Sequence, residues 1–160
     1  MAQLTHINDE GEASMVNVGP KHTSFRKAVV HGEVSVSNTC VESLTEELCR
    51  EVISVARVAG TQAAKQTAML IPHCHQIPLD SLRVQAHLDR KEHKFYLVVE
   101  ASATGKTGVE MEAFTACHIA ALSIYDMLKA IDPEAVMGPF ALVEKTGGKH
   151  GHWKRSGSTC

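Results

Sequence analysis

The sequence has little of what marks a secreted, membrane or nucleic-acid-binding protein. No apolar run approaches the length that crosses a membrane, and the first residues, MAQLTHINDEGEAS, lack the basic start and apolar core of a signal peptide. The net charge of −2 gives no general attraction to nucleic acid or to an anionic membrane. The five cysteines are odd in number and scattered, without a paired disulfide framework. We therefore expect a cytoplasmic protein with no nucleic-acid or membrane partner.

A complete phosphate-binding P-loop is also absent, although residues 105–107 read Gly-Lys-Thr after a strand-like run. The motif G-x-x-x-x-G-K-[ST] requires glycine at position 100, and the residue there is Glu100, whose carboxylate would repel phosphate. Thr107 and Glu110 have the spacing of a capping box, so this pattern predicts mainly a helix start. Lys106, beside that helix N-terminus, could still assist an anion.

The order of the predicted elements indicates an α+β fold. Apolar and polar residues alternate strictly over SLRVQAHLD, as in a half-buried strand, while the two longest apolar patterns have helical spacing. The predicted strands are residues 26–36, 81–89, 94–101 and 140–143, and the predicted helices are residues 41–70 and 108–131. The resulting β-α-β-β-α-β order is typical of ferredoxin-like folds, in which an antiparallel sheet carries both helices on one face.

The chain has the length of one domain. Its 160 residues can form a single core, and we see no linker or internal repeat, so we predict one domain over residues 1–160. We expect the polar ends, residues 1–14 and 147–160, to be flexible. Gly60, inside the first predicted helix, indicates either a break or a close contact with another helix.

The second predicted helix carries polar residues that its composition does not require. It is so rich in Ala, Leu, Ile and Met that it should be largely buried. At about 100° per residue, Glu112, Thr115, Asp126 and Lys129 lie within a sector of about 100°. A surface ion pair would explain Asp126 and Lys129. Partial burial beside the Glu112 carboxylate would instead tune their pKa values for general acid and base catalysis, and the residues alone leave both interpretations open.

The segment LIPHCHQIP, residues 70–78, is predicted to be a rigid loop between two prolines. It carries His73, Cys74 and His75, and both residue types ligate zinc. Adjacent ligands without a C-x-x-C or H-x-x-x-H pair do not complete a tetrahedral site, however. The pattern favours a histidine that donates a hydrogen bond or carries a proton, with a zinc-binding module as an alternative.

Basic residues and glycines gather in EKTGGKHGHWKR, residues 144–155. This segment is either a solvated end or a flexible strap whose cations, Lys145 among them, fold over a polyphosphate. Lys65, on the first predicted helix, either lies along the protein surface or adds another cation.

Several segments together resemble one known family. The segments are LTHIN with GEASMVNVG, VARVAGTQAAK, LIPHCH, TGKTGVEMEAFTA, IYDMLKAI and EKTGGKHG. On these motifs, which extend over nearly the whole chain, the sequence resembles the cyclic pyranopterin monophosphate synthase family, which acts second in molybdenum cofactor biosynthesis. The resemblance implies a ferredoxin-like subunit in a homohexamer, a trimer of dimers, with active sites between subunits. It also implies a functional partner, the upstream radical GTP cyclase.

The same resemblance implies a lyase that converts 3′,8-cyclo-7,8-dihydro-GTP to cyclic pyranopterin monophosphate and pyrophosphate. Asp126 and Lys129 correspond to its catalytic acid/base pair. The implied substrate-binding positions are His73, Cys74, His75, Met111, Glu112, Lys65 and Lys145. The reaction requires no cofactor, and Mg²⁺ carried by the substrate triphosphate is compatible with it.

The chain departs from the family pattern at Cys49, where members generally carry a lysine that takes part in the site. Arg50 could reach the same anion from one residue along, but a guanidinium does not exchange protons near neutral pH. His73 also replaces a usually apolar residue, and Asn17 a usual aspartate. An alternative function is therefore a catalytically weak paralogue that binds a nucleotide or pterin without turnover.

Overall fold

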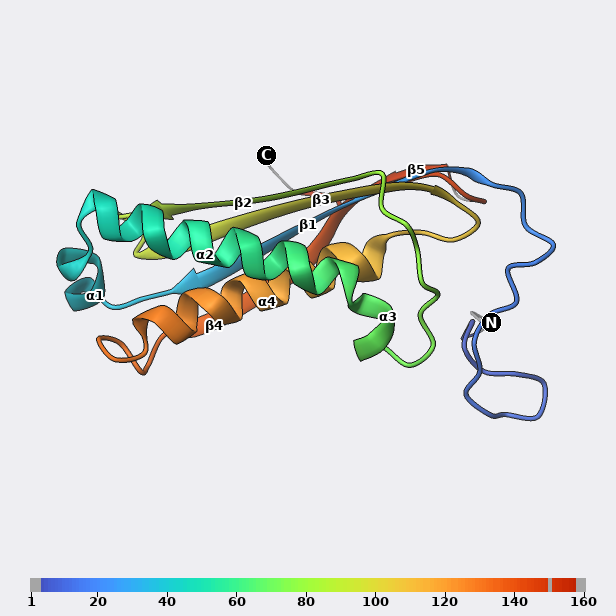
Figure 1. Cartoon of the computed structure of the whole chain (residues 1–160), viewed down its shortest axis with the longest axis horizontal. Coiled ribbons are helices and arrows are strands. Elements are labelled where there is room, and N and C mark those ends of the chain that lie inside the picture. The colour runs from blue at the N-terminus through green and yellow to red at the C-terminus, as the bar shows by residue number, and fades with distance from the viewer. Residues whose placement is uncertain (1–3, 150, 158–160) are drawn as a thin grey trace.

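A computed structural model describes residues 4–149 and 151–157 of the chain. Two long helices lie side by side along one face of a five-stranded antiparallel sheet with the strand order β2-β3-β1-β4-β5 (Figure 1). The strands are β1 (Ser24–Ser35), β2 (Ser81–Asp89), β3 (Lys94–Gly105), β4 (Val136–Thr146) and β5 (His152–Lys154), and the helices are α1 (Asn38–Ser43), α2 (Glu46–Lys65), α3 (Thr67–Leu70) and α4 (Glu110–Leu128). The first four strands with α2 and α4 have the predicted β-α-β-β-α-β order, so the α+β, ferredoxin-like fold is confirmed.

The sheet is built around β1, which pairs with β3 on one side and β4 on the other. The predicted strand at residues 81–89 has the same bounds as β2. The last predicted strand was too short, because β4 runs through Gly138 and Pro139, residues that ordinarily end a strand pattern. Two register shifts between β1 and β4 accommodate this irregular sequence within the ladder.

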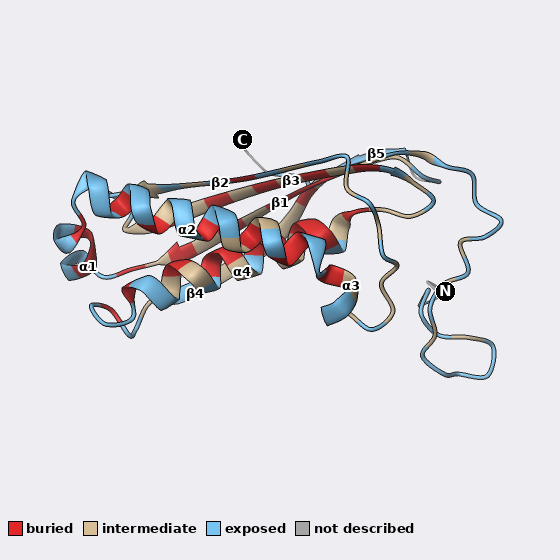
Figure 2. Ribbon diagram, viewed as in Figure 1, coloured by how far each residue is buried: buried red, intermediate tan, exposed pale blue. Residues whose placement is uncertain are grey.

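The core lies between the sheet and the two long helices, and Figure 2 shows the buried residues on their facing sides. The buried face of α4 is rich in alanine, which lets α2 approach closely. Gly60 does not break α2: a Cβ there would lie 2.8 Å from the backbone oxygen of Ala116 and 3.2 Å from the Cβ of Ala120. Of the two interpretations of Gly60, close helix contact is confirmed.

The predicted capping box at the start of α4 is wrong. The N-cap residue is Val109, and no side chain caps the helix there. Glu110 pairs instead with Lys145 of β4, with 3.3 Å between Nζ and Oε1. The Glu110 carboxylate, which the local pattern assigned to capping the helix, therefore binds a lysine of β4 instead.

The end of the chain returns to the sheet. β5 pairs with the end of β4, with Trp153 opposite Lys145, an element that the sequence pattern did not predict. The single domain and the flexible ends stay predictions. In the part of the chain that the structure describes, no helix has the length and apolar character needed to span a membrane.

Candidate functional site

Two adjoining cavities lie beside the start of α4. The first, which we call the histidine cavity, has a volume of about 340 Å³. The second, the basic cavity, has a volume of about 470 Å³. Thr5, Lys21, Gly108 and Glu110 line both cavities, so the two are neighbouring parts of one depression.

The histidine cavity brings together five of the predicted site residues. The loop after α3 supplies three of them and the first turn of α4 supplies the other two. They are His73, Cys74, His75, Met111 and Glu112. A turn in which the Cys74 amide donates to the Ile71 carbonyl at 3.1 Å shapes the start of this loop.

Glu112 is the buried carboxylate of the histidine cavity. Its residue is 3% exposed, and its Oε2 atom is buried without a hydrogen-bond partner among the described residues. Burial raises the pKa of Glu112 to about 7, and the nearby Glu110 charge adds to this effect against a backbone hydrogen bond that lowers it. A carboxyl with such a pKa can either donate or accept a proton near neutral pH.

Cys74 lies in the same cavity as a neutral thiol. Burial raises its pKa, and the carboxylates of Glu112 and Glu110 raise it further. A cysteine binds zinc as the thiolate, and a zinc site also needs other converging ligands. Within residues 4–149 and 151–157, no group of three or more His, Cys, Asp or Glu side chains is placed to hold a metal ion. The geometry gives no support to the zinc-binding alternative.

The basic cavity gathers cations from distant parts of the sequence. They are Lys21, Arg26, Lys27, Lys145 and Lys149. Only Lys145 was a predicted site residue. Arg26 and Lys27 reach Lys145 because the start of β1 pairs with the end of β4, where Lys27 lies opposite Thr146.

Two glycines allow the chain after β4 to fold over the start of β1. Gly147 and Gly148 have φ angles of +100° and +75°. A Cβ at Gly147 would lie 2.2 Å from the Phe25 carbonyl oxygen, and one at Gly148 would lie 2.2 Å from Nη1 of Arg26. At Gly147 both the positive φ and the Phe25 backbone exclude a side chain, whereas at Gly148 the positive φ favours glycine and the nearby Arg26 end can move. This close turn brings Lys149 to the basic cavity.

Asp126 and Lys129 lie at the opposite end of α4. The Lys129 ammonium donates to Asp126 Oδ1 at 2.5 Å, and the side chains are 57% and 67% exposed. The bond to Asp126 raises the pKa of Lys129. Glu112 is almost four turns earlier, roughly 21 Å along the helix axis. Of the two interpretations left open by the sequence, the single chain shows the exposed ion pair, and it does not place Asp126 and Lys129 beside Glu112.

Cys49 lies at the same end of the molecule as Asp126 and Lys129. The two long helices are antiparallel and touch where Gly60 of α2 meets Ala116 of α4. Cys49 lies roughly three turns before this contact on α2, and Lys129 lies a similar distance after it on α4, so both reach the same end. Cys49 is 7% exposed and belongs to the core, and burial raises the pKa of its thiol. Arg50, the next residue, is exposed.

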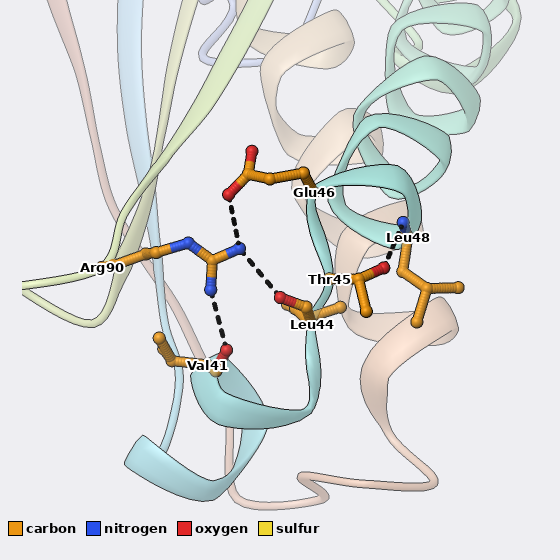
Figure 3. Close-up of polar contacts among 6 residues, drawn as sticks. All are labelled: Val41, Leu44, Thr45, Glu46, Leu48 and Arg90. Atoms are coloured by element: carbon orange, nitrogen blue, oxygen red, sulfur yellow. Dashed lines mark hydrogen bonds and ion pairs between the residues drawn. The ribbon is translucent and has the colours of Figure 1, made fainter.

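Arg90 fixes the backbone that leads into this part of α2, as Figure 3 shows. Its guanidinium donates to the carbonyl oxygens of Val41 at 3.0 Å and Leu44 at 2.8 Å, and to Glu46 Oε1 at 3.0 Å. Thr45 then caps α2 by accepting from the Leu48 amide at 3.2 Å. The Arg90 guanidinium is thus engaged in holding the α1–α2 connection.

Lys65 does not line either cavity. It lies in a groove of about 740 Å³ between α2 and the edge strand β2, together with Arg57 and Arg83. It also borders a space beside Ile77 and Pro78. The structure therefore brings together six of the nine predicted site residues in the two cavities, and leaves Lys65, Asp126 and Lys129 outside them.

Comparison with known proteins gives consistent matches over the whole fold. A family model described as the MoaC family matches residues 15–148. The cyclic pyranopterin monophosphate synthase of Geobacillus kaustophilus is 43% identical over 159 residues, covering 97% of this chain and 98% of that protein. The enzyme of the same name from Pelotomaculum thermopropionicum is 46% identical, covering 98% and 94%. Among solved structures, a de novo designed protein with a ferredoxin fold aligns with 72% of this chain and 83% of its own length, at 14% identity and a TM-score of 0.36.

Proposed function

The chain belongs to the MoaC family, and on that premise we propose that it is a cyclic pyranopterin monophosphate synthase, a lyase of molybdenum cofactor biosynthesis. Its substrate would be 3′,8-cyclo-7,8-dihydro-GTP, and its products cyclic pyranopterin monophosphate and pyrophosphate. The observation that supports this most is the pairing of a cavity rich in proton-transfer groups with an adjoining cavity rich in cations. The substrate has the same two parts, a purine-derived ring system and a triphosphate.

The basic cavity is proposed to bind the triphosphate. Lysine and arginine side chains form strong charge-assisted hydrogen bonds with phosphate oxygens. They would also stabilise the charge that develops on pyrophosphate as the cyclic phosphodiester closes. The reaction needs no redox cofactor or resident metal, and any Mg²⁺ would enter on the triphosphate as part of the substrate.

The histidine cavity is proposed to hold the ring system. Opening and rebuilding the rings requires proton transfers at nitrogen and oxygen atoms. Glu112 has a pKa near neutrality, and His75 supplies an imidazole in the same cavity. Both residues are therefore suited to hold or move protons at the ring.

Asp126 and Lys129 are proposed as the acid/base pair, acting from a second subunit. In one chain they lie too far from the histidine cavity to touch the same substrate. A second copy that places the end of its α4 over this cavity would complete the site. We propose that such sites occur in a homohexamer, a trimer of dimers, whose substrate comes from the upstream radical GTP cyclase.

A cytoplasmic location fits the cysteines, because Cys40, Cys49, Cys74 and Cys117 are free thiols in the structure. Disulfides persist mainly in oxidising compartments, so four unpaired thiols favour a reducing one.

The function is tested by anaerobic incubation of the purified protein with 3′,8-cyclo-7,8-dihydro-GTP. Pyrophosphate and the oxidised, fluorescent pterin product are both followed. Formation of both, and its loss in Asp126→Asn, would support the lyase. Tight binding without either product would select the alternative, a weak paralogue, which the burial of Cys49 at the family lysine position favours.

A further inference from the structure

The segment before β1 forms a wall of the candidate site. Thr5 and Lys21 line both cavities, and His6 and Val16 line the histidine cavity. The Lys106 ammonium donates to the Gly19 carbonyl at 2.7 Å and so ties this segment to the connection between β3 and α4. Residues far from α4 in sequence thus close the depression at its start.

This segment is held in a compact turn by its own hydrogen bonds. The Ser14 amide donates to the His6 carbonyl at 2.8 Å, and the Asn8 amide donates to the Glu12 carbonyl at 2.9 Å. The Asn8 side-chain oxygen accepts from the amides of Glu10 at 3.1 Å and Glu12 at 2.8 Å. These hydrogen bonds restrict the turn, which reduces the conformational entropy that a bound ligand would have to remove.

His6 occupies a defined position in this wall. Its ring stacks against that of His73, with 6.1 Å between ring centroids and 26° between planes. That spacing is within the range of direct pairing, so the two rings form one continuous surface of the histidine cavity. Neither His6 nor this surface was predicted from the sequence.

The hydrogen bond of His6 also fixes which nitrogen can meet a ligand. Nδ1 lies 3.2 Å from the Ser14 carbonyl oxygen, which can only accept, so Nδ1 carries the proton. In the neutral ring Nε2 is then a hydrogen-bond acceptor, and it has no partner among the described residues. A purine-derived ring with N–H groups on its pyrimidinone edge offers the donors that such an acceptor would bind.

We propose that His6 is a substrate-contacting residue that accepts a hydrogen bond from an N–H group of the ring system through Nε2 while its ring extends the surface of His73. The proposal deepens the proposed function and rests on it for the identity of the ligand. It assigns ring recognition to the turn of residues 6–14, separately from triphosphate binding in the basic cavity.

Substitutions at His6 separate ligand contact from a role in the turn. His6→Ala removes both ring nitrogens. His6→Gln places an amide near the position of Nε2, whereas His6→Asn places one near Nδ1, where it can still bond Ser14. His22→Ala is the matched control, because His22 is exposed in the same segment and lines neither cavity.

Affinity for 3′,8-cyclo-7,8-dihydro-GTP is measured by anaerobic calorimetry in an Asp126→Asn background, and affinity for inorganic triphosphate is measured beside it. We expect His6→Ala to weaken substrate binding about tenfold and His6→Gln to restore most of it, as for one lost and regained hydrogen bond. Triphosphate binding should not change, which also shows that the fold is intact. Equal affinities in His6→Ala and His22→Ala, or rescue by Asn rather than Gln, would overturn the proposal. Pyrophosphate release with Asp126 intact reports on the proposed function independently.

Discussion

A Cβ placed on Gly60 of α2 would lie 2.8 Å from the backbone oxygen of Ala116 on α4. The two helices are therefore in backbone contact, with no room for another methyl group. We expect Gly60→Ala to lower the free energy of unfolding by about 1–3 kcal/mol, even though alanine favours the helix by about 1 kcal/mol. Denaturant unfolding checks this. Glu51 is exposed on the same helix, and Glu51→Ala should change the free energy of unfolding by less than about 0.5 kcal/mol.

The raised pKa of Glu112 makes stability depend on pH. Between the ordinary value of 4.5 and the folded value of about 7, the folded protein keeps a proton that the unfolded chain has released. The contribution to the free energy of unfolding is therefore full below about pH 4.5 and is lost as pH rises from there through the folded pKa of about 7. At 1.36 kcal/mol per pKa unit the loss is about 3 kcal/mol.

Glu112→Gln removes this dependence. Relative to the wild type, the variant's free energy of unfolding should rise by about 2.5 kcal/mol between pH 5 and pH 8, measured by urea unfolding at both values. Glu51→Gln, which alters an exposed carboxylate on α2, is the control and should not show this gain. Parallel curves for Glu112→Gln and wild type would contradict the buried, protonated carboxyl.

Features set by local pattern were predictable from the sequence. In β2, apolar and polar residues alternate strictly from Leu82 to Leu88, and this local pattern is enough to predict a strand with one buried face. The two long helices were predicted for the same reason. α1 was missed because its six residues contain little more than one turn of pattern.

Features set by contacts between distant segments were not predictable in this way. Arg26 and Lys27 reach the basic cavity only because antiparallel pairing puts the start of β1 beside the end of β4. The helical sector that grouped Glu112 with Asp126 was computed from rotation alone. Rotation ignores the rise of 1.5 Å per residue, which separates them by roughly 21 Å.

The bonds of Arg90 in Figure 3 predict a local stability effect. Arg90→Ala removes a charged donor from the carbonyls of Val41 and Leu44, so the free energy of unfolding should fall by about 2 kcal/mol. Glu46→Ala deletes only an exposed ion pair and should cost less than about 0.5 kcal/mol. Thermal and denaturant unfolding of both variants distinguish the carbonyl bonds from the ion pair. Equal losses in the two would mean that the ion pair, not the carbonyls, matters.

A site shared between subunits predicts complementation. Asp126→Asn and His75→Ala should each abolish turnover alone. Unfolding and refolding them together should restore roughly a quarter of wild-type activity, because half of randomly mixed dimers are hybrid and each hybrid has one intact site. Asp126→Asn mixed with Lys129→Ala is the matched control. Both changes lie at the same end of α4, so no hybrid site is intact and no activity should return.

Arg50 is the residue best placed to replace the charge that Cys49 cannot supply. Cys49 is buried, whereas Arg50 is exposed one position along, at the end of the molecule that carries Asp126 and Lys129. We expect Arg50→Ala to lower kcat/KM at least about tenfold, as for the loss of one charged hydrogen bond. Arg57→Ala, an exposed arginine on the same helix, is the control and should leave kcat/KM unchanged.

Adding Cys49→Lys to Arg50→Ala completes this test. A lysine at position 49 can extend its ammonium group out of the core along the helix surface, so it should recover much of the lost kcat/KM. It should also lower the free energy of unfolding by about 1–3 kcal/mol, because a longer side chain replaces a packed thiol. Recovery of activity together with this loss of stability would show that the site needs a cation here and that Arg50 provides it. If Arg50→Ala turned over like the wild type, the charge at this position would be dispensable in this chain.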